Sequence, residues 1–175
     1  MFAAAIIRNT VESSKKFEIH IDKIETIGTD HCSFNFKGQK ERGISDFSKI
    51  PNGIPGVEHR PVLLYTFGVK EGILSKEQFC ALLSTNAAKL FGMYPQKGVI
   101  AEGSDGDIVV WDPLFKGRIT QREQIQNVDY TPYEEMDTLG RAEYVFLRGI
   151  PVVEQGKILR EKEGRFIPRG KTQDI

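Results

Sequence analysis

Apolar residues recur at helical spacing in the middle of the chain. Ser75 and Gln78 have the arrangement of an N-terminal capping box, and Gly92 is suited to end the helix that follows. Between them, apolar side chains repeat every three or four residues, which predicts one buried helix face: Phe79, Leu82, Leu83, Ala87, Leu90 and Phe91. A preceding helix is predicted to begin at Pro61, and residues 62–69 are apolar nearly all round, as in a buried helix.

The pattern changes at Pro95, and the region from about residue 97 onward predicts β-structure. Residues 108–111 are four apolar residues between turn signals, which predicts a buried strand. A second strand is predicted at 143–148. Residues 151–159 predict a hairpin in which Gly156 supplies the positive φ of the turn.

The half of the chain before Pro95 predicts no complete domain, and its candidate site lies before residue 59. Residues 11–21 predict a helix, and a short strand is predicted at 24–28. Residues 1–10 are either a buried strand or an irregular start of the chain. Asp30 follows that strand and opens a loop over residues 30–56 that is rich in Gly and Pro. A loop of this length is uncommon in a compact domain unless it has a function. In α/β enzymes such loops stand at the carboxyl edge of the sheet, where catalytic side chains converge.

Composition and charge exclude several classes of function. With 175 residues, 39% hydrophobic and 27% charged, the chain is globular. Its net charge is zero, which argues against a nucleic acid partner. No apolar run approaches the about 20 residues that span a bilayer, and the short apolar start lacks the pattern of a secretion signal, so no membrane partner is expected. Two cysteines form no disulfide framework or zinc pattern, which favours the cytoplasm.

Two residues of the loop are candidates for chemistry. The carboxylate of Asp30 can bind a metal ion or transfer a proton, although an aspartate after a strand is more commonly a turn or helix cap. Asn52 lies in the sequence Ile-Pro-Asn-Gly-Ile-Pro-Gly, where the rigid backbone or the amide can pair with a substrate. The alternative for Asn52 is an ordinary tight turn.

The other reactive residue types favour structural roles. His20, His31 and His59 have no helical metal-ligand spacing, and each is interpreted as a hydrogen-bonded structural histidine. Cys32 is interpreted as a small buried side chain. The charges of residues 37–42 predict a solvated face of the loop.

Several linked motifs resemble the dihydropyrimidinase and D-hydantoinase family of metal-dependent amidohydrolases. The resemblance covers roughly residues 20–155 and is carried by the segments 28–34, 46–60, 83–92 and 98–113. The first reads Gly-Thr-Asp-His-Cys-Ser-Phe, and the second contains Lys-Ile-Pro-Asn-Gly-Ile-Pro-Gly.

This resemblance implies an α/β fold: the C-terminal part of a TIM-type (β/α)8 barrel over residues 1–96, part of a small β-sandwich domain over 97–160, and a tail over 161–175. It implies two divalent metal ions, usually zinc, held with a carboxylated lysine and a hydroxide. The implied substrates are small cyclic amides such as dihydrouracil, dihydrothymine and hydantoins, and the family members are usually homotetramers.

The resemblance also assigns roles to the two candidates. Asp30 matches the last metal ligand, which serves as the acid and base of ring opening, and Asn52 matches the asparagine whose backbone holds the ring. The departures are upstream: none of the three histidines matches the family's His-x-His, and a substrate-binding Ser-Pro-Pro-Leu-Arg segment is replaced by Ala-Ile-Ile-Arg ending at Arg8. The chain is therefore expected to carry only part of the site and to be inactive alone. The alternatives are a non-catalytic truncated homologue or a binding protein like the collapsin response mediator proteins.

Overall fold

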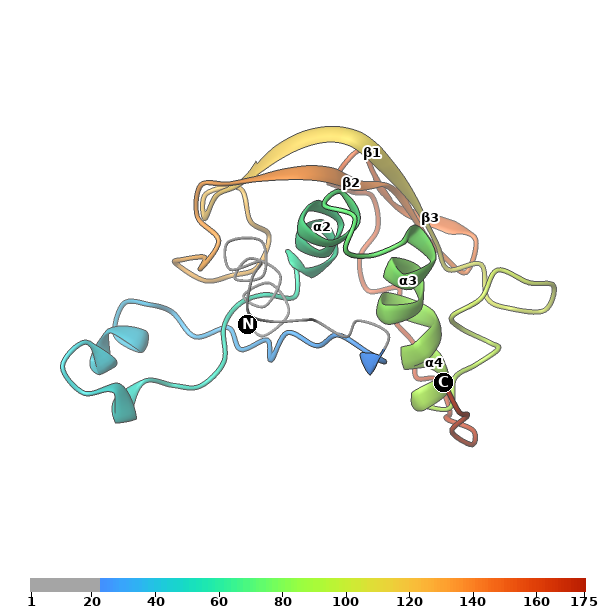
Figure 1. The fold of residues 1–175 in the computed structure, drawn as a ribbon, viewed down its shortest axis with the longest axis horizontal. Helices are drawn as coiled ribbons and strands as arrows, with labels where there is room; N and C mark the ends of the chain where they lie inside the picture. The colour runs from blue at the N-terminus through green and yellow to red at the C-terminus, as the bar shows by residue number, and fades with distance from the viewer. Residues whose placement is uncertain (1–22) are drawn as a thin grey trace. The chain divides into compact units, whose positions relative to one another are not determined.

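The computed structural model describes residues 23–175 (Figure 1). These residues form two compact units. One unit contains residues 28–71 and 116–139, and the other contains residues 23–27, 72–115 and 140–175. Each unit therefore combines segments that are far apart in the sequence. The elements expected within residues 1–21 and the substrate segment ending at Arg8 lie outside the described residues. The division at residues 96 and 160 stays a prediction.

The first unit is built on a buried helix. α2 (Arg60–Leu64) continues without a break into a π-helical turn, η4 (Tyr65–Val69), which confirms the helix predicted from Pro61. Leu63 and Leu64 are buried, as the apolar pattern predicts. The buried hydroxyl of Thr66 donates to Val62 O at 2.7 Å and accepts from Leu139 N at 2.9 Å, so the polar group satisfies a distant backbone donor.

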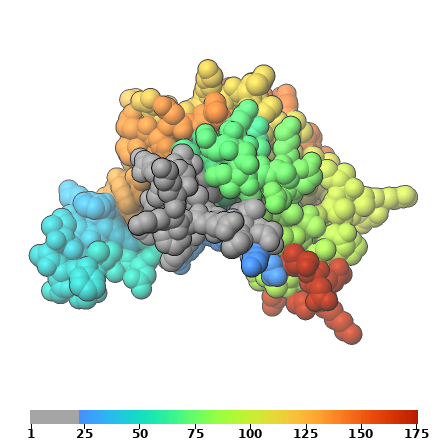
Figure 2. All heavy atoms as spheres, viewed as in Figure 1, coloured from blue at the N-terminus to red at the C-terminus, as the bar shows by residue number. Residues whose placement is uncertain are grey.

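Residues 30–56 form the predicted long loop, which contains two short 3-10 turns, η2 (Lys40–Gly43) and η3 (Phe47–Lys49). Its atoms, in cyan for the most part, form one compact lobe (Figure 2). The start of the loop is fixed to residues far along the chain, because the carboxylate of Asp129 accepts from Phe36 N at 2.6 Å and Lys37 N at 3.1 Å.

The second unit contains the helix that the capping box predicts. α3 (Lys76–Cys80), the π-helical turn η5 (Ala81–Thr85) and α4 (Asn86–Leu90) follow one another directly. Both bonds of the box are present: Gln78 N donates to Ser75 Oγ at 3.1 Å, and Ser75 N donates to Gln78 Oε1 at 2.8 Å. The buried face is confirmed at Leu82 but is wrong near the end, where Leu90 and Phe91 are 39% and 48% exposed.

A meandering sheet of four strands, in the order β1-β2-β3-β4, contains β1 (Ile108–Ile119), β2 (Met136–Leu147), β3 (Ile150–Glu154) and β4 (Lys157–Ile158). β2 pairs with β3, and β3 with β4, in antiparallel register. The predicted hairpin is confirmed: Gln155 and Gly156 both have positive φ between β3 and β4. Among residues 23–175 no helix is long and apolar enough to cross a bilayer.

Two predictions about strands are wrong. Residues 24–28 form no strand, and Glu25 O accepts from the side chain of Asn86 at 2.8 Å. The strand at 108–111 exists but is not buried, since Val109 and Val110 are 56% and 45% exposed. An apolar run reports strand propensity, whereas burial depends on what packs against the strand.

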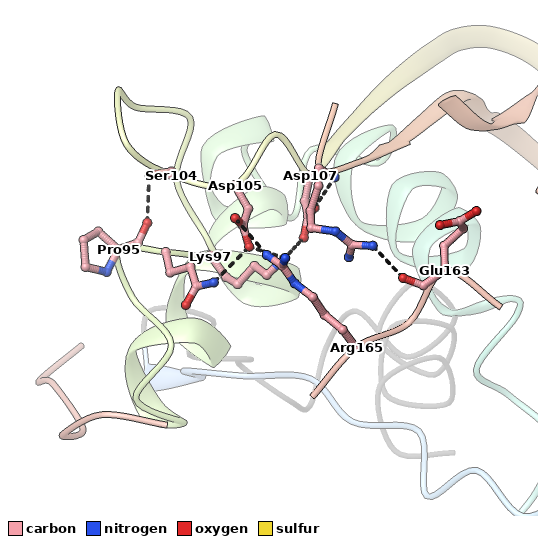
Figure 3. A network of polar contacts seen from close by, with 9 residues as sticks. Pro95, Lys97, Ser104, Asp105, Asp107, Glu163 and Arg165 are labelled. Atoms are coloured by element: carbon pink, nitrogen blue, oxygen red, sulfur yellow. Dashed lines mark hydrogen bonds and ion pairs between the residues drawn. The ribbon is translucent and has the colours of Figure 1, made fainter. Parts of the chain in front are cut away.

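A charged network fixes the segment that leads into β1 (Figure 3). The ammonium of Lys97 pairs with Asp105 at 2.9 Å and also with Asp107, and Arg165 pairs with Asp105 at 3.5 Å. The hydrogen bond from Lys97 lowers the pKa of Asp105. Arg148 joins the network, because its backbone N donates to Asp107 Oδ1 at 2.8 Å. The network thus connects residues before β1 with residues after β2.

The capping box makes stability at the start of α3 testable. Ser75→Ala removes the acceptor for Gln78 N, so we expect the free energy of unfolding to fall by about 1 kcal/mol in urea denaturation. Ser75→Asp keeps an oxygen acceptor and should retain most of the stability. Equal losses in the two variants would show that the hydrogen bond does not stabilise the helix.

Candidate active site

The backbone at Asp30 is hydrogen-bonded to the turn that contains Asn52. Cys32 N donates to Ile54 O at 3.1 Å, and Ile54 N donates to Asp30 O at 3.4 Å. His31 and Ile54 therefore form a parallel bridge that closes the long loop. Asp30 and Asn52, the two candidates from the sequence, thus lie on neighbouring backbone segments. We call residues 51–54 the asparagine turn.

Gly53 allows the two segments to approach closely. It has a φ of 81°, and a Cβ atom at this position would lie 2.6 Å from Cys32 Sγ and 2.8 Å from Asp30 O. No real side chain tolerates such distances without a shift of the backbone. This close packing of the turn therefore requires glycine at position 53. One of the groups that Gly53 packs against is the half-buried side chain of Cys32.

Asp30 is exposed and has a left-handed backbone, with a φ of 48°. Across residues 23–175 its carboxylate forms no hydrogen bond or ion pair, so it is neither a helix cap nor the acceptor of a turn. A left-handed conformation is uncommon for residues other than glycine, although aspartate tolerates it better than most. The carboxylate is available to a ligand, and its catalytic role stays a prediction.

Asn52 is also exposed, and neither its peptide N–H nor its C=O is paired with any described residue. The carbonyls on either side are held, because the ammonium of Lys40 donates to both Pro51 O and Gly53 O. The same ammonium lies 5.5 Å from the centre of the Phe34 ring. The prediction of a solvated charged face over residues 37–42 is therefore wrong for Lys40, which is half-buried and binds the turn.

His31 connects the bridge to the next residues of the loop. Its Nδ1 accepts from Gly56 N at 3.2 Å and from Val57 N at 3.3 Å. The interpretation of His31 as a hydrogen-bonded structural histidine is confirmed, and sequence reasoning missed which groups it binds. His20 lies outside the described residues.

A second loop, residues 124–126, is held against Pro55 and Glu58, which follow the asparagine turn. The carboxylate of Glu58 accepts from Ile125 N at 2.9 and 3.0 Å and from Gln126 N at 2.9 Å. The side-chain amide of Gln126 donates to Pro55 O at 3.3 Å. No local pattern marks Glu58 or Gln126 in the sequence, because each contact joins residues more than sixty positions apart.

His59 is buried beside this loop. It is 6% exposed, lies edge-on to Tyr133 with ring centres 5.8 Å apart, and its Nε2 is 3.3 Å from the side-chain nitrogen of Gln126. Burial lowers the pKa of His59, while the charge of Glu58 and a hydrogen bond with Gln124 oppose that effect. Burial therefore favours the neutral form of His59, and its contacts with Gln126 and Tyr133 confirm its interpretation as a hydrogen-bonded structural histidine.

The residues that the structure describes hold no cluster of three or more His, Cys, Asp or Glu side chains that could bind a metal ion. Asp30 supplies the kind of oxygen donor that divalent metals accept, and it faces no competing partner in this part of the chain. The carboxylate of Asp30 thus has the chemistry of a single metal ligand.

Comparison with known proteins identifies the lineage. A family model described as "Amidohydrolase family" matches residues 6–152. This chain belongs to the amidohydrolase family. The D-hydantoinase of Ralstonia pickettii is 48% identical over 148 residues, which are 84% of this chain and 32% of that protein. The D-phenylhydantoinase of Escherichia coli O81 (strain ED1a) is 39% identical over 171 residues, which are 93% of this chain and 36% of that protein.

Solved structures of hydantoinase-type amidohydrolases match the fold of this chain as well. The dihydropyrimidinase from Brevibacillus agri NCHU1002 superposes with a TM-score of 0.83 at 40% identity, over 98% of this chain and 36% of that one. The D-hydantoinase from Bacillus sp. AR9 gives a TM-score of 0.81 at 46% identity, over 86% and 33%. The chain spans about a third of the length of these relatives. The resemblance read from the sequence is confirmed.

The lowered pKa of His59 predicts a pH dependence of stability. In the unfolded chain a histidine binds a proton below about pH 6.5, whereas folded His59 resists protonation. Above pH 6.5 neither state of the chain gains this proton, and the full free energy of unfolding is present. As the pH falls from 6.5 toward the lowered pKa of folded His59, the unfolded chain alone binds the proton and the free energy of unfolding decreases. We expect urea denaturation to give a smaller free energy of unfolding at pH 5.5 than at pH 7.5.

The variant His59→Asn stays neutral at both pH values, so it should be less stable throughout but lose part of this slope. A titration of the His59 ring by NMR provides the direct check. A ring that titrates at or above pH 6.5 in the folded chain would contradict the assignment.

Proposed function

We propose that this chain provides part of the active site of a hydantoinase-type hydrolase, which opens the ring of small cyclic amides such as dihydropyrimidines and hydantoins. The observation that carries the proposal is the juxtaposition of an unpaired carboxylate, Asp30, with the unpaired peptide edge of Asn52 across one parallel bridge. Family membership and the named activities of the relatives support it.

In this proposal Asp30 moves the proton. As water attacks the carbonyl carbon of the ring, the carboxylate of Asp30 accepts a proton from the water. It then gives this proton to the ring nitrogen as the C–N bond breaks. The exposure of Asp30 and its freedom from other partners among residues 23–175 support this role, because a carboxylate committed to a salt bridge or a cap transfers protons poorly.

Asn52 holds the ring through its backbone. A cyclic amide presents a donor N–H and an acceptor C=O side by side, and the peptide groups of Asn52 offer the complementary acceptor and donor. Satisfying both groups fixes the orientation of the ring relative to the carboxylate of Asp30. Such positioning is a large part of the catalytic effect of enzymes.

The remaining features of the family belong to the same proposal. Two divalent metal ions, usually zinc in this family, would be held by Asp30 and by ligands outside the described residues. When bound, they would lower the pKa of water to about 7 and so make a nucleophile available at neutral pH. The barrel and β-sandwich assignments of residues 1–96 and 97–160, and a homotetramer, complete the proposed architecture.

The 175-residue chain alone should not open dihydrouracil, even with added zinc. Asp30 is a single ligand, and the described residues supply no cluster that could complete a metal site. The loss of dihydrouracil absorbance on incubation with the purified chain measures this. Zinc-dependent turnover by the chain would contradict the prediction.

A chimera tests the role of Asp30. The matching third of the D-hydantoinase of Ralstonia pickettii is replaced by this chain, and hydantoin hydrolysis is measured with and without Asp30→Asn. We expect kcat to fall by about 100-fold or more, because general acid–base catalysis is lost, while the melting temperature stays similar.

The matched control is Asp46→Asn, an acid of the same loop that bonds Ser48 and pairs with Lys49. Its turnover should stay within about threefold of the parent, as for most surface substitutions. Equal effects of the two variants would remove Asp30 from the mechanism. A parent chimera that folds but hydrolyses nothing would favour the non-catalytic alternative.

A further inference from the structure

We propose that Lys40 is a positioning residue for the substrate edge of the asparagine turn: it holds the carbonyls on both sides of Asn52 so that the peptide groups of Asn52 itself stay available to a cyclic amide. This inference rests on the proposed function and adds to it a residue that acts through the turn rather than on the substrate.

Lys40 is a half-buried side chain that binds the backbone of the turn, and it does not act as a solvated surface charge. The side chain leaves the first residue of η2 and is half-buried. Its ammonium has three donors, of which two are directed to Pro51 O and Gly53 O, and the face of the Phe34 ring lies nearby. No carboxylate pairs with this ammonium within residues 23–175. Backbone carbonyls of the turn are therefore the main compensation for its burial.

The positions of the two bonded carbonyls matter. Pro51 C=O belongs to the same peptide unit as Asn52 N–H, and Gly53 C=O belongs to the unit that follows the one containing Asn52 C=O. A cation on a peptide carbonyl polarises that unit and makes its N–H a stronger donor. Lys40 therefore orders the turn and also strengthens the hydrogen-bond donor that the proposed function assigns to the ring.

Two lysines of one loop allow a matched test. Lys40→Met removes the ammonium but keeps a flexible apolar side chain of similar length. Lys37→Met removes the same charge from an exposed side chain three residues earlier, for which no side-chain contact is seen in the described structure. Lys40→Arg keeps both charge and donors and should recover part of the loss.

The first readout is kinetic, in the chimera described above. If the turn holds the ring equally in the ground state and the transition state, Lys40→Met raises KM about tenfold and leaves kcat nearly unchanged. A purely structural role would lower the fraction of folded enzyme, and so lower the apparent kcat without changing KM. Lys37→Met should match the parent in both constants.

The second readout uses the 175-residue chain itself and does not depend on activity. The amides of Cys32 and Ile54 form the bridge bonds, so their hydrogen exchange reports whether the turn is held. We expect exchange at both amides to be about tenfold faster in Lys40→Met than in Lys37→Met.

The outcomes separate this proposal from the proposed function. Faster exchange with an inactive parent chimera supports Lys40 as the support of the turn and counts against the hydrolase assignment. An active chimera in which Lys40→Met and Lys37→Met share the same KM overturns the role of Lys40 while leaving the hydrolase assignment intact. Equal exchange in the two variants overturns it as well.

Discussion

The pairing of the Asp30 segment with the asparagine turn is the constraint on which the candidate site depends. Closing a loop as long as residues 30–56 has an entropic cost that two bridge hydrogen bonds do not offset alone. Gly53 permits the close packing at the closure, and Lys40 and His31 bind the backbone on either side of Ile54. These contacts involve the same few residues, and together they hold the Asp30 segment beside the asparagine turn.

Polar contacts hold the second loop, residues 124–126, against Pro55 and Glu58, which follow the asparagine turn. The carboxylate of Glu58 accepts from the backbone donors of residues 125–126, and the buried ring of His59 packs against Tyr133 beside them. Replacing Glu58 would leave the part-buried N–H of Gln126 without this acceptor, which costs free energy. The loop at residues 124–126 is thus part of the site's support although it has no recognisable motif.

The sequence predicts well whatever depends on neighbours a few residues apart. The capping box of Ser75 and the turn at Gly156 are read correctly because each signal and its partner lie within one turn of backbone. The predicted strand at residues 24–28 and the predicted burial of Val109 are wrong, because strand pairing and burial both depend on segments far away in the chain. The linked motifs around Asp30 and Asn52 predict the lineage, but nothing in them shows that Lys40, which resembles any solvated loop lysine, binds the turn.

Several unfavourable local features occur together at the candidate site. Asp30 has a left-handed backbone that costs a residue with a side chain about 1 kcal/mol, its carboxylate has no partner in the described chain, and the peptide groups of Asn52 beside it are unpaired. Each feature alone is unremarkable in a loop. Their concentration on two bridged segments is the pattern expected of a ligand-binding site and supports the proposed roles of Asp30 and Asn52.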